Sequence, residues 1–329
     1  MREISVVGIY DVDRDRADKL AVSFGIKKIY ASLEELKATE IDVLDICTPP
    51  QSHEQLVVKS LENGINCLVE KPFSVTRKEC DFMIQTAQRT NQRLFPIQNY
   101  SFMPAMLKAK SLIKRGEIGK VVSASFRYYT SFDDHRHKLF LEQDHWVHRI
   151  PGDVFSDLAI HAAFSIVETI GKPEQVKAVV KNTSCNPNIV GDELQVIVTT
   201  RDAIGSFLVS YSSDMKMFLG EVVGTKGALR IDSSSQTLVK SRPVKNSRDA
   251  LSRGVQALSE IVQLTSNLIV TASNVMLRRY STVTYGHEYL FRRCFRNMKF
   301  DEPYPISLQD VRDSIVLCEE AFDQISNKA

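Results

Sequence analysis

The sequence has no cysteine pair of the C-x-x-C type and no cysteine-rich segment. Its six cysteines are spread over 329 residues, at positions 47, 67, 80, 185, 294 and 318. Closely spaced thiols are typical of zinc sites and of the disulfide frameworks of small secreted proteins. Without such pairs, the sequence predicts reduced, mostly buried thiols, no metal site and a cytoplasmic location.

The sequence also has little net charge and no long apolar run. Its 42 Lys and Arg and 40 Asp and Glu give a net charge of +2, and the basic residues are scattered. We therefore expect no nucleic-acid partner, because such partners require a basic patch or stripe. The first residues turn acidic too early for a signal peptide. The segment closest to a membrane span, residues 258–277, contains Glu260 and many small polar residues, so we do not expect it to cross a membrane.

That same segment has apolar residues at helical spacing. They stand at positions 258, 261, 262, 268, 269, 272, 275 and 276. This spacing predicts a helix whose apolar stripe is buried against the body of the protein or against a partner subunit. Attachment of the stripe to a membrane surface, with Arg278 and Arg279 just beyond it, is the less favoured alternative. The polar residues 233–250 before the helix predict a mobile loop.

The first part of the chain alternates strand and helix signals at short intervals. The predicted strands are 4–10, 41–47, 65–70 and 93–99. Such alternation is typical of βαβ units with a parallel sheet. We assign residues 1–119 to an α/β domain of the dinucleotide-binding (Rossmann) type.

The rest of the chain has a different pattern of predicted elements. Strands are predicted at 121–129, 175–182, 194–200, 203–212, 218–224 and 228–232, with one helix at about 153–170. Residues 120–305 therefore form an α+β domain with a large, mostly antiparallel, open-faced sheet. The helix in residues 306–329 is expected to pack back on the first domain. Open sheet faces often pair, so we expect a homo-oligomer.

Polar residues follow several strands of the first domain. These positions are Asp11, Thr48-Pro49, Glu70-Lys71-Pro72 and Gln98-Asn99. Ligands of open α/β sheets bind at the carboxyl ends of the strands. Asp11 has the place of the acid that bonds the ribose of NAD, although Arg14 leaves NADP open. Lys71, partly buried, suits proton transfer. Taken singly, each position also fits a helix cap or a surface charge.

Asp157 and His161 are four residues apart on the helix predicted at 153–170, so they share one face. A carboxylate beside a histidine can orient the ring for acid–base catalysis; an ordinary surface pair is the alternative. The preceding residues 132–153 contain four of the seven histidines and Trp146. They lack a metal-ligand spacing. We interpret them as a loop that covers the substrate, with a solvated loop as the alternative.

In chain order, four short patterns resemble the Gfo/Idh/MocA family of glucose–fructose oxidoreductase and inositol-dehydrogenase-like enzymes. They are Thr48-Pro49-Pro50 with His53, Glu70-Lys71-Pro72, Gly116-Glu117-Ile118-Gly119, and Asp157 with His161. The resemblance implies hydride transfer between NAD(P) and a hydroxyl-bearing carbon of a sugar, cyclitol or nucleotide-sugar. Lys71 then holds the hydroxyl, and His161 exchanges its proton beside Asp157. The implied cofactor-binding residues are Asp11, Thr48, Pro49, His53, Glu70, Lys71 and Gln98.

The chain departs from the family pattern at its start. The family opens with a strand, a G-x-G-x-x-G turn that binds the pyrophosphate, and a helix. In this chain Gly8 has no second glycine after it until Gly25, and the sequence matches the family from its second strand. We favour a longer reading frame as the explanation. The alternatives are a true loss, which predicts an impaired dehydrogenase-like binding or regulatory protein, or a gap closed by rearranged pairing or another chain.

Overall fold

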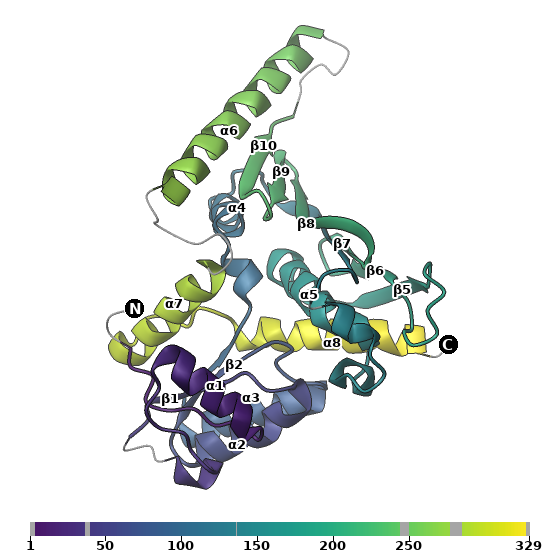
Figure 1. Ribbon diagram of the computed structural model, residues 1–329. Coiled ribbons are helices and arrows are strands. Elements are labelled where there is room, and N and C mark those ends of the chain that lie inside the picture. Colours follow the sequence, from purple (N-terminus) through teal and green to yellow (C-terminus); the bar gives the residue numbers. More distant parts are fainter. Residues whose placement is uncertain (1–3, 37–39, 136, 244–249, 277–284, 327–329) are drawn as a thin grey trace.

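The computed structural model describes residues 4–36, 40–135, 137–243, 250–276 and 285–326. Its first part is a parallel sheet in the order β1 (Val43–Ile46), β2 (Asn66–Val69) and β3 (Leu94–Pro96). Helices α1 (Arg14–Phe24), α2 (His53–Glu62) and α3 (Arg77–Thr90) accompany the sheet (Figure 1). The predicted Rossmann-type arrangement is therefore confirmed for three of its four strands.

Local signals explain where these helices begin and end. Thr76 and Glu79 form a reciprocal capping box at the start of α3. Gly25 ends α1 in the left-handed conformation, with φ of 67°. The sheet is anchored by β2, in which Cys67, Leu68 and Val69 are buried. This burial is typical of a central parallel strand covered on both faces.

The prediction of a strand at residues 4–10 is wrong. Only an isolated parallel bridge joins Ile9 to Ile29, and Val6 and Val7 are exposed. Residues with high strand propensity form a strand only where a neighbouring strand satisfies their backbone groups. Among the described residues, the bridge at Ile9 is the only β pairing of residues 4–10, and they do not pair with the free edge of β1.

The second part is a seven-stranded sheet in the order β10-β9-β8-β4-β7-β6-β5. The strands are β4 (Val121–Ser131), β5 (Gln175–Lys181), β6 (Glu193–Thr199), β7 (Ile204–Ser210), β8 (Ser212–Gly224), β9 (Gly227–Asp232) and β10 (Thr237–Ser241). All neighbouring strands pair in the antiparallel direction except β4 and β7, which pair in parallel. The six predicted strands are confirmed. The loop expected at 233–250 is wrong in part, because its residues 237–241 form the edge strand β10.

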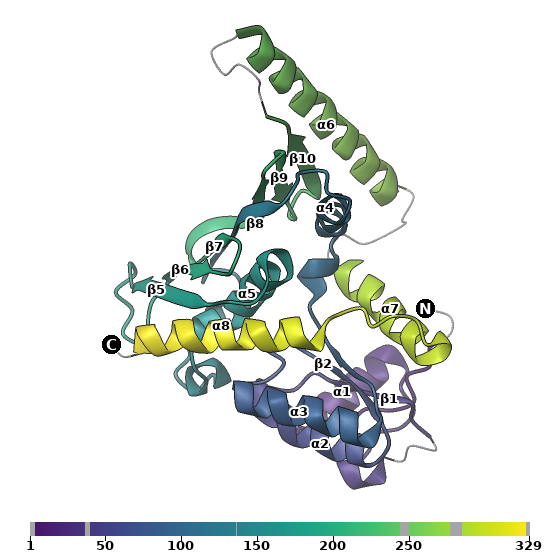
Figure 2. The same cartoon turned by 180° about the vertical axis from the view of Figure 1, so that it is seen from behind.

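Helices join the two parts. The buried helix α5 (Ser156–Ile170) packs on β4 and β7, and α4 (Pro104–Lys114) lies near β9 and β10. The C-terminal helix α8 (Leu308–Ser326) reaches both parts: Arg312 bonds Asp81 of α3, and Gln324 bonds the backbone of β5. Figure 2 shows α8 running across the molecule between the two sheets.

Helix α7 (Tyr285–Phe300) also belongs spatially to the first sheet. Arg93, just before β3, donates hydrogen bonds to Asn297 at 2.6 Å and to Asp301 at 2.8 Å. The ring of Tyr304 stacks on Phe95 of β3 with centroids 5.0 Å apart. The domain limits after residues 119 and 305 remain a prediction, but these contacts place residues 285–304 beside the first sheet.

Helix α6 (Ala250–Met276) includes residues 258–276 of the helix predicted at 258–277, and it lies along β10 at one end of the molecule (Figures 1 and 2). Its apolar stripe is exposed to solvent, so the prediction that the stripe is buried against the body is wrong. The side chain of Val275 and residues Arg278 and Arg279 lie outside the described residues. No helix in the described part of the chain is both long and apolar enough to cross a membrane.

Candidate functional site

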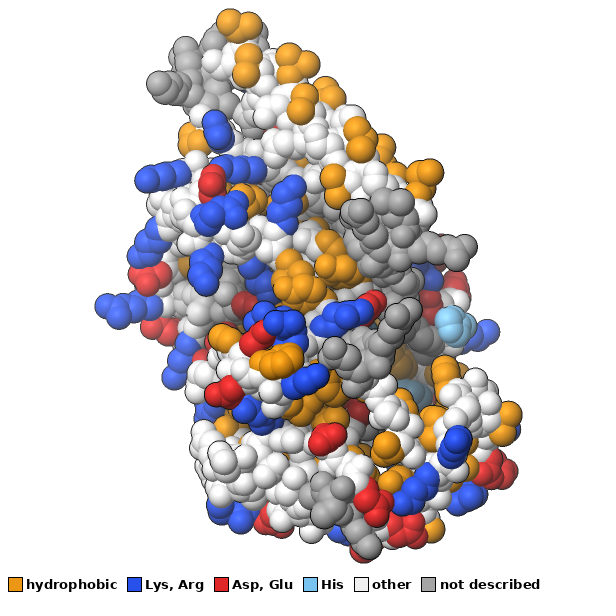
Figure 3. All heavy atoms as spheres, turned by 90° about the vertical axis from the view of Figure 1, so that its left-hand side faces the viewer, with side chains coloured by type: hydrophobic (Ala, Val, Ile, Leu, Met, Phe, Trp, Pro, Cys, Tyr) orange, Lys and Arg blue, Asp and Glu red, His pale blue; other side chains and the backbone are white. Residues whose placement is uncertain are grey.

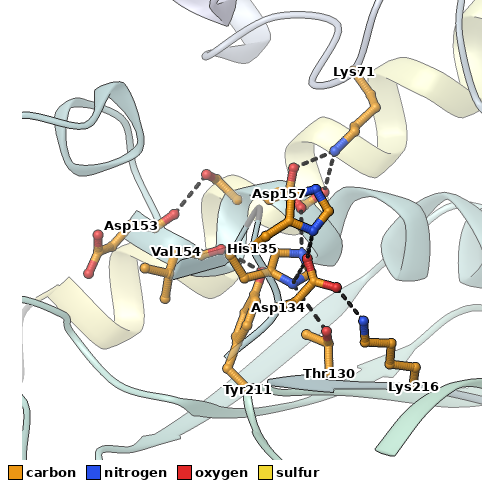
Figure 4. Close-up of polar contacts among 11 residues, drawn as sticks. Lys71, Thr130, Asp134, His135, Asp153, Val154, Asp157, Tyr211 and Lys216 are labelled. Carbon is orange, nitrogen blue, oxygen red and sulfur yellow. Dashed lines mark hydrogen bonds and ion pairs between the residues drawn. The ribbon is translucent and has the colours of Figure 1, made fainter. Parts of the chain in front are cut away.

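Lys71 and Asp157 meet between the two parts of the molecule. Lys71 follows β2, and Asp157 stands in the first turn of α5. The Lys71 ammonium forms an ion pair with the Asp157 carboxylate and donates a hydrogen bond to the Asp157 backbone oxygen at 3.2 Å. Figure 4 shows the two side chains pointing toward each other. Two residues that sequence reasoning assigned to one site are thus brought together.

The second oxygen of Asp157 faces a histidine. His137 Nε2 lies 3.8 Å from Asp157 Oδ2, and its Nδ1 lies 3.1 Å from the hydroxyl of Thr130. Burial alone raises the pKa of Asp157, but the charge of Lys71 and hydrogen bonds from His137 and Lys71 outweigh it and hold the pKa well below 3.8. Asp157 is therefore a permanent carboxylate at neutral pH.

His161 lies one turn further along α5 and is buried. Its Nδ1 has no hydrogen-bond partner. Burial, strengthened by the positive charge of Lys71, lowers the pKa of His161 well below 6.5. The imidazole is therefore neutral at pH 7 and can accept a proton. Its ring packs against Tyr100, with centroids 4.6 Å apart.

Glu70 organises the other side of Lys71. Its carboxylate accepts a hydrogen bond from the Lys71 backbone N–H at 3.1 Å, and its Oε1 lies 3.4 Å from His287 Nε2 of α7. Burial, added to the negative charge of Glu70, raises the pKa of Asp45 to about 6. Sequence reasoning missed His287, because 217 residues separate it from Glu70 and it belongs to no local pattern.

His53 holds the backbone of the site together. Its Nε2 lies 2.8 Å from the carbonyl oxygen of Thr48, and its Nδ1 lies 3.2 Å from that of Phe73. The side chain is fully buried, and burial lowers its pKa from 6.5. The neutral ring therefore lies between the carbonyls of Thr48 and Phe73, which follow two neighbouring strands, and its single N–H donates to one of them. A part for His53 in cofactor binding stays a prediction.

Gln98 is a buried residue at this edge whose side-chain amide has no hydrogen-bond partner among the described residues. It follows β3, is 1% exposed, and neither its amide nitrogen nor its amide oxygen has a hydrogen-bond partner. An unpaired buried amide costs about 1–3 kcal/mol. An amide with both groups unpaired fits a ligand that offers a donor and an acceptor, as a carboxamide does.

Asp11 stands apart from these groups. Its carboxylate accepts a hydrogen bond from the Asp13 N–H at 2.9 Å and lies 3.7 Å from Arg16, both at the start of α1. Its place just after the bridge at Ile9 agrees with the place expected of a ribose-binding acid. The structure leaves the ribose contact as a prediction.

Residues 137–153 contain short 3₁₀-helices, among them His137–Leu141 and Trp146–Arg149. His148 Nδ1 lies 2.5 Å from the carboxylate of Asp153, whose other oxygen accepts a hydrogen bond from the Val190 N–H at 2.7 Å. The Gln51 amide donates to the Trp146 carbonyl at 3.1 Å, which ties this segment to the Pro49 turn. Among the described residues, no cluster of His, Cys, Asp and Glu could hold a metal ion.

These residues fit the nicotinamide end of a dinucleotide. Thr48, Glu70, Lys71 and Gln98 all follow strands of the parallel sheet, where such ligands bind. The unpaired amide of Gln98 and the neutral imidazole of His161 supply hydrogen-bonding groups that nothing in the described chain uses. Residues 1–329 include no glycine-rich turn for the pyrophosphate.

Two family models match the chain. Residues 1–98 match the oxidoreductase family with an NAD-binding Rossmann fold, and residues 106–230 match the GFO/IDH/MocA C-terminal domain. A D-apiose dehydrogenase from Paraburkholderia graminis is 24% identical over 72% of this chain. The match spans 63% of that protein, so this chain corresponds to less than two thirds of it. The trans-1,2-dihydrobenzene-1,2-diol dehydrogenase of Mus musculus is 30% identical over 70% of this chain and 67% of its own.

Solved structures share the fold. The WlbA dehydrogenase from Bordetella pertussis, in complex with NADH and UDP-GlcNAcA, aligns with a TM-score of 0.77 and 15% identity over 99% of this chain and 89% of its own. An oxidoreductase from Agrobacterium radiobacter, in complex with NAD+, L-tartaric acid and magnesium, aligns with a TM-score of 0.74 and 18% identity over 99% and 90%. Together, the two family models and the mouse relative show that this chain belongs to the Gfo/Idh/MocA oxidoreductase family.

Proposed function

We propose that this protein transfers hydride between NAD and a hydroxyl-bearing carbon of a sugar, a cyclitol or a nucleotide-sugar. The observation that carries the proposal is the pairing of Lys71 with Asp157 beside the buried, neutral His161. Removing hydride from a carbinol carbon requires that the hydroxyl proton leave as well. The site contains a cation to hold the hydroxyl oxygen and a neutral base to take the proton.

Each residue has a distinct part in this mechanism. The Lys71 ammonium donates a hydrogen bond to the substrate hydroxyl oxygen and favours its ionised form. Asp157 keeps Lys71 oriented through its carboxylate and its backbone oxygen. His161, whose Nδ1 has no hydrogen-bond partner, accepts the hydroxyl proton. NAD supplies the hydride acceptor when bound, with Thr48, Glu70 and Gln98 as the residues that would hold its nicotinamide end.

Aromatic residues beside His161 support a substrate with an apolar ring face. Tyr100, Tyr128 and Phe218 form a cluster in which Tyr128 and Phe218 stack with centroids 4.0 Å apart. Tyr128 and Phe218 are buried, whereas Tyr100 is half-buried, so of the three rings Tyr100 is the one that offers apolar surface to the carbon-bound face of a sugar ring. The relatives named for apiose and the neighbour crystallised with UDP-GlcNAcA support the same class of substrate.

An activity screen tests the proposal. The purified protein is mixed with NAD+, or separately with NADP+, and a panel of aldoses, inositols and nucleotide-sugars, and formation of the reduced cofactor is followed by absorbance. We expect reduction with at least one polyol and a preference for NAD+. A protein that binds members of the panel but reduces neither cofactor would instead be the non-catalytic binder, and the enzymatic proposal would be rejected.

The location of the protein is part of the proposal. All six cysteines are free, and four of them are buried. Free thiols persist in reducing compartments, which supports the cytoplasm. Fractionation of cells of the native source, followed by immunodetection, tests this point.

A further inference from the structure

Helix α6 is attached to the sheet by its polar face. The side-chain amide of Gln263 accepts a hydrogen bond from the Lys240 N–H at 2.8 Å and donates one to the Lys240 carbonyl at 3.0 Å. Asn267 donates to the Leu238 carbonyl at 2.7 Å and accepts from Lys108 of α4 at 3.3 Å. Glu260 pairs with Arg230 of β9. These contacts satisfy the free edge of β10 much as another strand would.

The opposite face of α6 is apolar and exposed. Seven large side chains on it are each more than half exposed: Val255, Leu258, Ile261, Val262, Leu268, Ile269 and Met276. Figure 3 shows hydrophobic side chains in a row along this helix at the upper edge of the molecule. Isolated exposed apolar residues are common, but a continuous apolar face of this length marks an interaction surface.

The spacing of the exposed face is that of a coiled-coil seam. Positions 255, 258, 262, 265, 269, 272 and 276 alternate steps of three and four residues, the a and d positions of a heptad repeat. Three of the a positions, Val255, Val262 and Ile269, are β-branched, which favours two-stranded pairing. The hydroxyl of Thr265 on the seam is already bonded to the Ile261 carbonyl at 2.9 Å. It therefore needs no water when the seam is covered.

The charge pattern decides between a second copy and a lipid surface. Between positions 254 and 276 the only charged residue is Glu260, on the face turned to the sheet. The flanking e positions are Ser259, Ser266 and Ser273. Helices that bind membrane surfaces are rich in Lys and Arg on their polar face, whereas α6 contains a single basic residue, Arg253 in its first turn. A neutral seam has no like-charge repulsion against its own copy.

The exposed apolar area of α6 is also sufficient for an interface between two copies. A fully exposed Val, Leu, Ile or Met side chain offers about 100 Å², so the seven residues, five on the seam and Ile261 and Leu268 at the flanking g positions, supply roughly 500 Å² per copy and about 1,000 Å² for two copies. That is about the lower limit for a stable interface. The match to the C-terminal domain model ends at residue 230, so α6 lies outside the part of the chain that the family models describe.

We propose that the exposed seam of α6 pairs with the α6 helix of a second copy of this chain, so that two molecules associate through a two-stranded helical contact. The contact lies at the end of the molecule remote from the first sheet (Figure 1). It leaves Lys71 and Asp157 accessible to ligands, and it does not depend on the enzymatic proposal.

Sedimentation velocity over a range of concentrations tests this pairing. The wild-type chain of 37.2 kDa is expected to sediment as a dimer or a larger even assembly. The double variant Val262→Glu with Ile269→Glu places two charges in the seam, and we expect its dissociation constant to rise at least about 10-fold. Both side chains are more than 60% exposed, so the thermal melting of the isolated subunit stays unchanged. Val22→Glu, at an 85% exposed position of α1, is the matched control and leaves the mass unchanged.

A cross-linking experiment locates the contact. Oxidation of Val262→Cys is expected to join peptides containing residue 262 from two copies, whereas Ala257→Cys, exposed but off the seam, is not. A wild-type chain that is monomeric at all concentrations, or a double variant with unchanged mass, overturns the pairing. So does binding of the wild-type chain to phosphatidylcholine vesicles that the double variant loses, because the seam would then bind lipid.

Discussion

Lys71 and Asp157, 86 residues apart, form an ion pair in which the lysine also donates to the aspartate's own backbone oxygen at 3.2 Å. Their side chains are 22% and 16% exposed, so the pair is largely shielded from water. The pairing joins the carboxyl end of β2 to the first turn of α5. The proposed chemistry depends on this junction.

Loss of the ammonium is the first test of that junction. Lys71→Met keeps the apolar stem and removes the charge, and we expect turnover to fall about 100-fold or more because the substrate hydroxyl loses its cation. The unpaired Asp157 carboxylate also lowers the free energy of unfolding, by about 3 kcal/mol. Steady-state kinetics and urea denaturation measure the two effects. Unchanged turnover in a folded variant would remove Lys71 from the reaction.

The pH dependence of stability tests Asp157. Its pKa in the folded protein is below the ordinary 3.8, so the folded state binds fewer protons than the unfolded state in that range. The stabilisation is complete above pH 3.8 and is lost as the pH falls toward the folded pKa. The difference in unfolding free energy between wild type and Asp157→Asn should therefore shrink below pH 3.8. A difference that stays constant in acid would contradict the assigned pairing.

The titration of His161 tests the electrostatics of the site. Burial and the charge of Lys71 keep its pKa well below 6.5, so the imidazole stays neutral as the pH falls through 6.5. NMR of the ring protons, assigned by comparison with His161→Asn, should show this low pKa in the wild type. In Lys71→Met the pKa should rise, because the neighbouring positive charge is gone. A pKa that is the same in both proteins would mean that Lys71 and His161 do not interact.

Gln98 and Gln236 form a matched pair of buried amides. Gln98 has no hydrogen-bond partner among the described residues, whereas Gln236 accepts from the Ala105 N–H at 3.2 Å and donates to the Ser233 carbonyl. Gln98→Leu should leave the stability of the ligand-free protein unchanged, or raise it by about 1 kcal/mol, while weakening NADH binding about 10-fold. Gln236→Leu should lower stability by about 1–3 kcal/mol and leave NADH binding intact. If Gln98→Leu lowered the stability and left NADH binding intact, Gln98 would be excluded as a cofactor contact.

Two helical glycines test how α7 packs. A Cβ on Gly286 would lie 2.1 Å from the Asn99 carbonyl oxygen, whereas a Cβ on Gly254 of α6 would meet nothing within 4 Å. Gly286→Ala should lower the melting temperature, because α7 must then move away from the residues after β3. This movement would also take His287 away from Glu70. Gly254→Ala should stabilise the protein by about 0.5–1 kcal/mol. Equal effects of the two substitutions would contradict the close approach of α7.

The sequence was sufficient to predict Lys71 and Asp157 as members of one site, because each belongs to a local pattern at a predictable place in its strand or helix. It did not identify the contacts of His137 and His287. His137 reaches Asp157 only through the particular fold of residues 132–153, and His287 reaches Glu70 only because α7 packs on the first sheet. No periodicity encodes such contacts.

The wrong predictions about the fold have similar causes. Residues 4–10 have strand propensity, but pairing requires a neighbour and only Ile9 has one among the described residues. Strand β10 is short, with the buried Leu238 and Val239 between polar residues, and it is recognisable only through its register with β9. The period of α6 predicted a helix, but the apolar face, expected to be buried against the body or a partner subunit, is exposed, and the polar face lies against the sheet. Gln263 and Asn267 decide that, by bonding the edge of β10.

Quenching of Trp146 fluorescence by NADH tests the central claim, that a nicotinamide cofactor binds beside Lys71, most directly. Trp146 is the only tryptophan, and its carbonyl accepts a hydrogen bond from Gln51 of the turn after β1. The account predicts saturable quenching with matching sensitised emission from NADH, retained in Lys71→Met and weakened in Gln98→Leu. Absence of saturable quenching, or quenching that Gln98→Leu leaves unchanged, would contradict it.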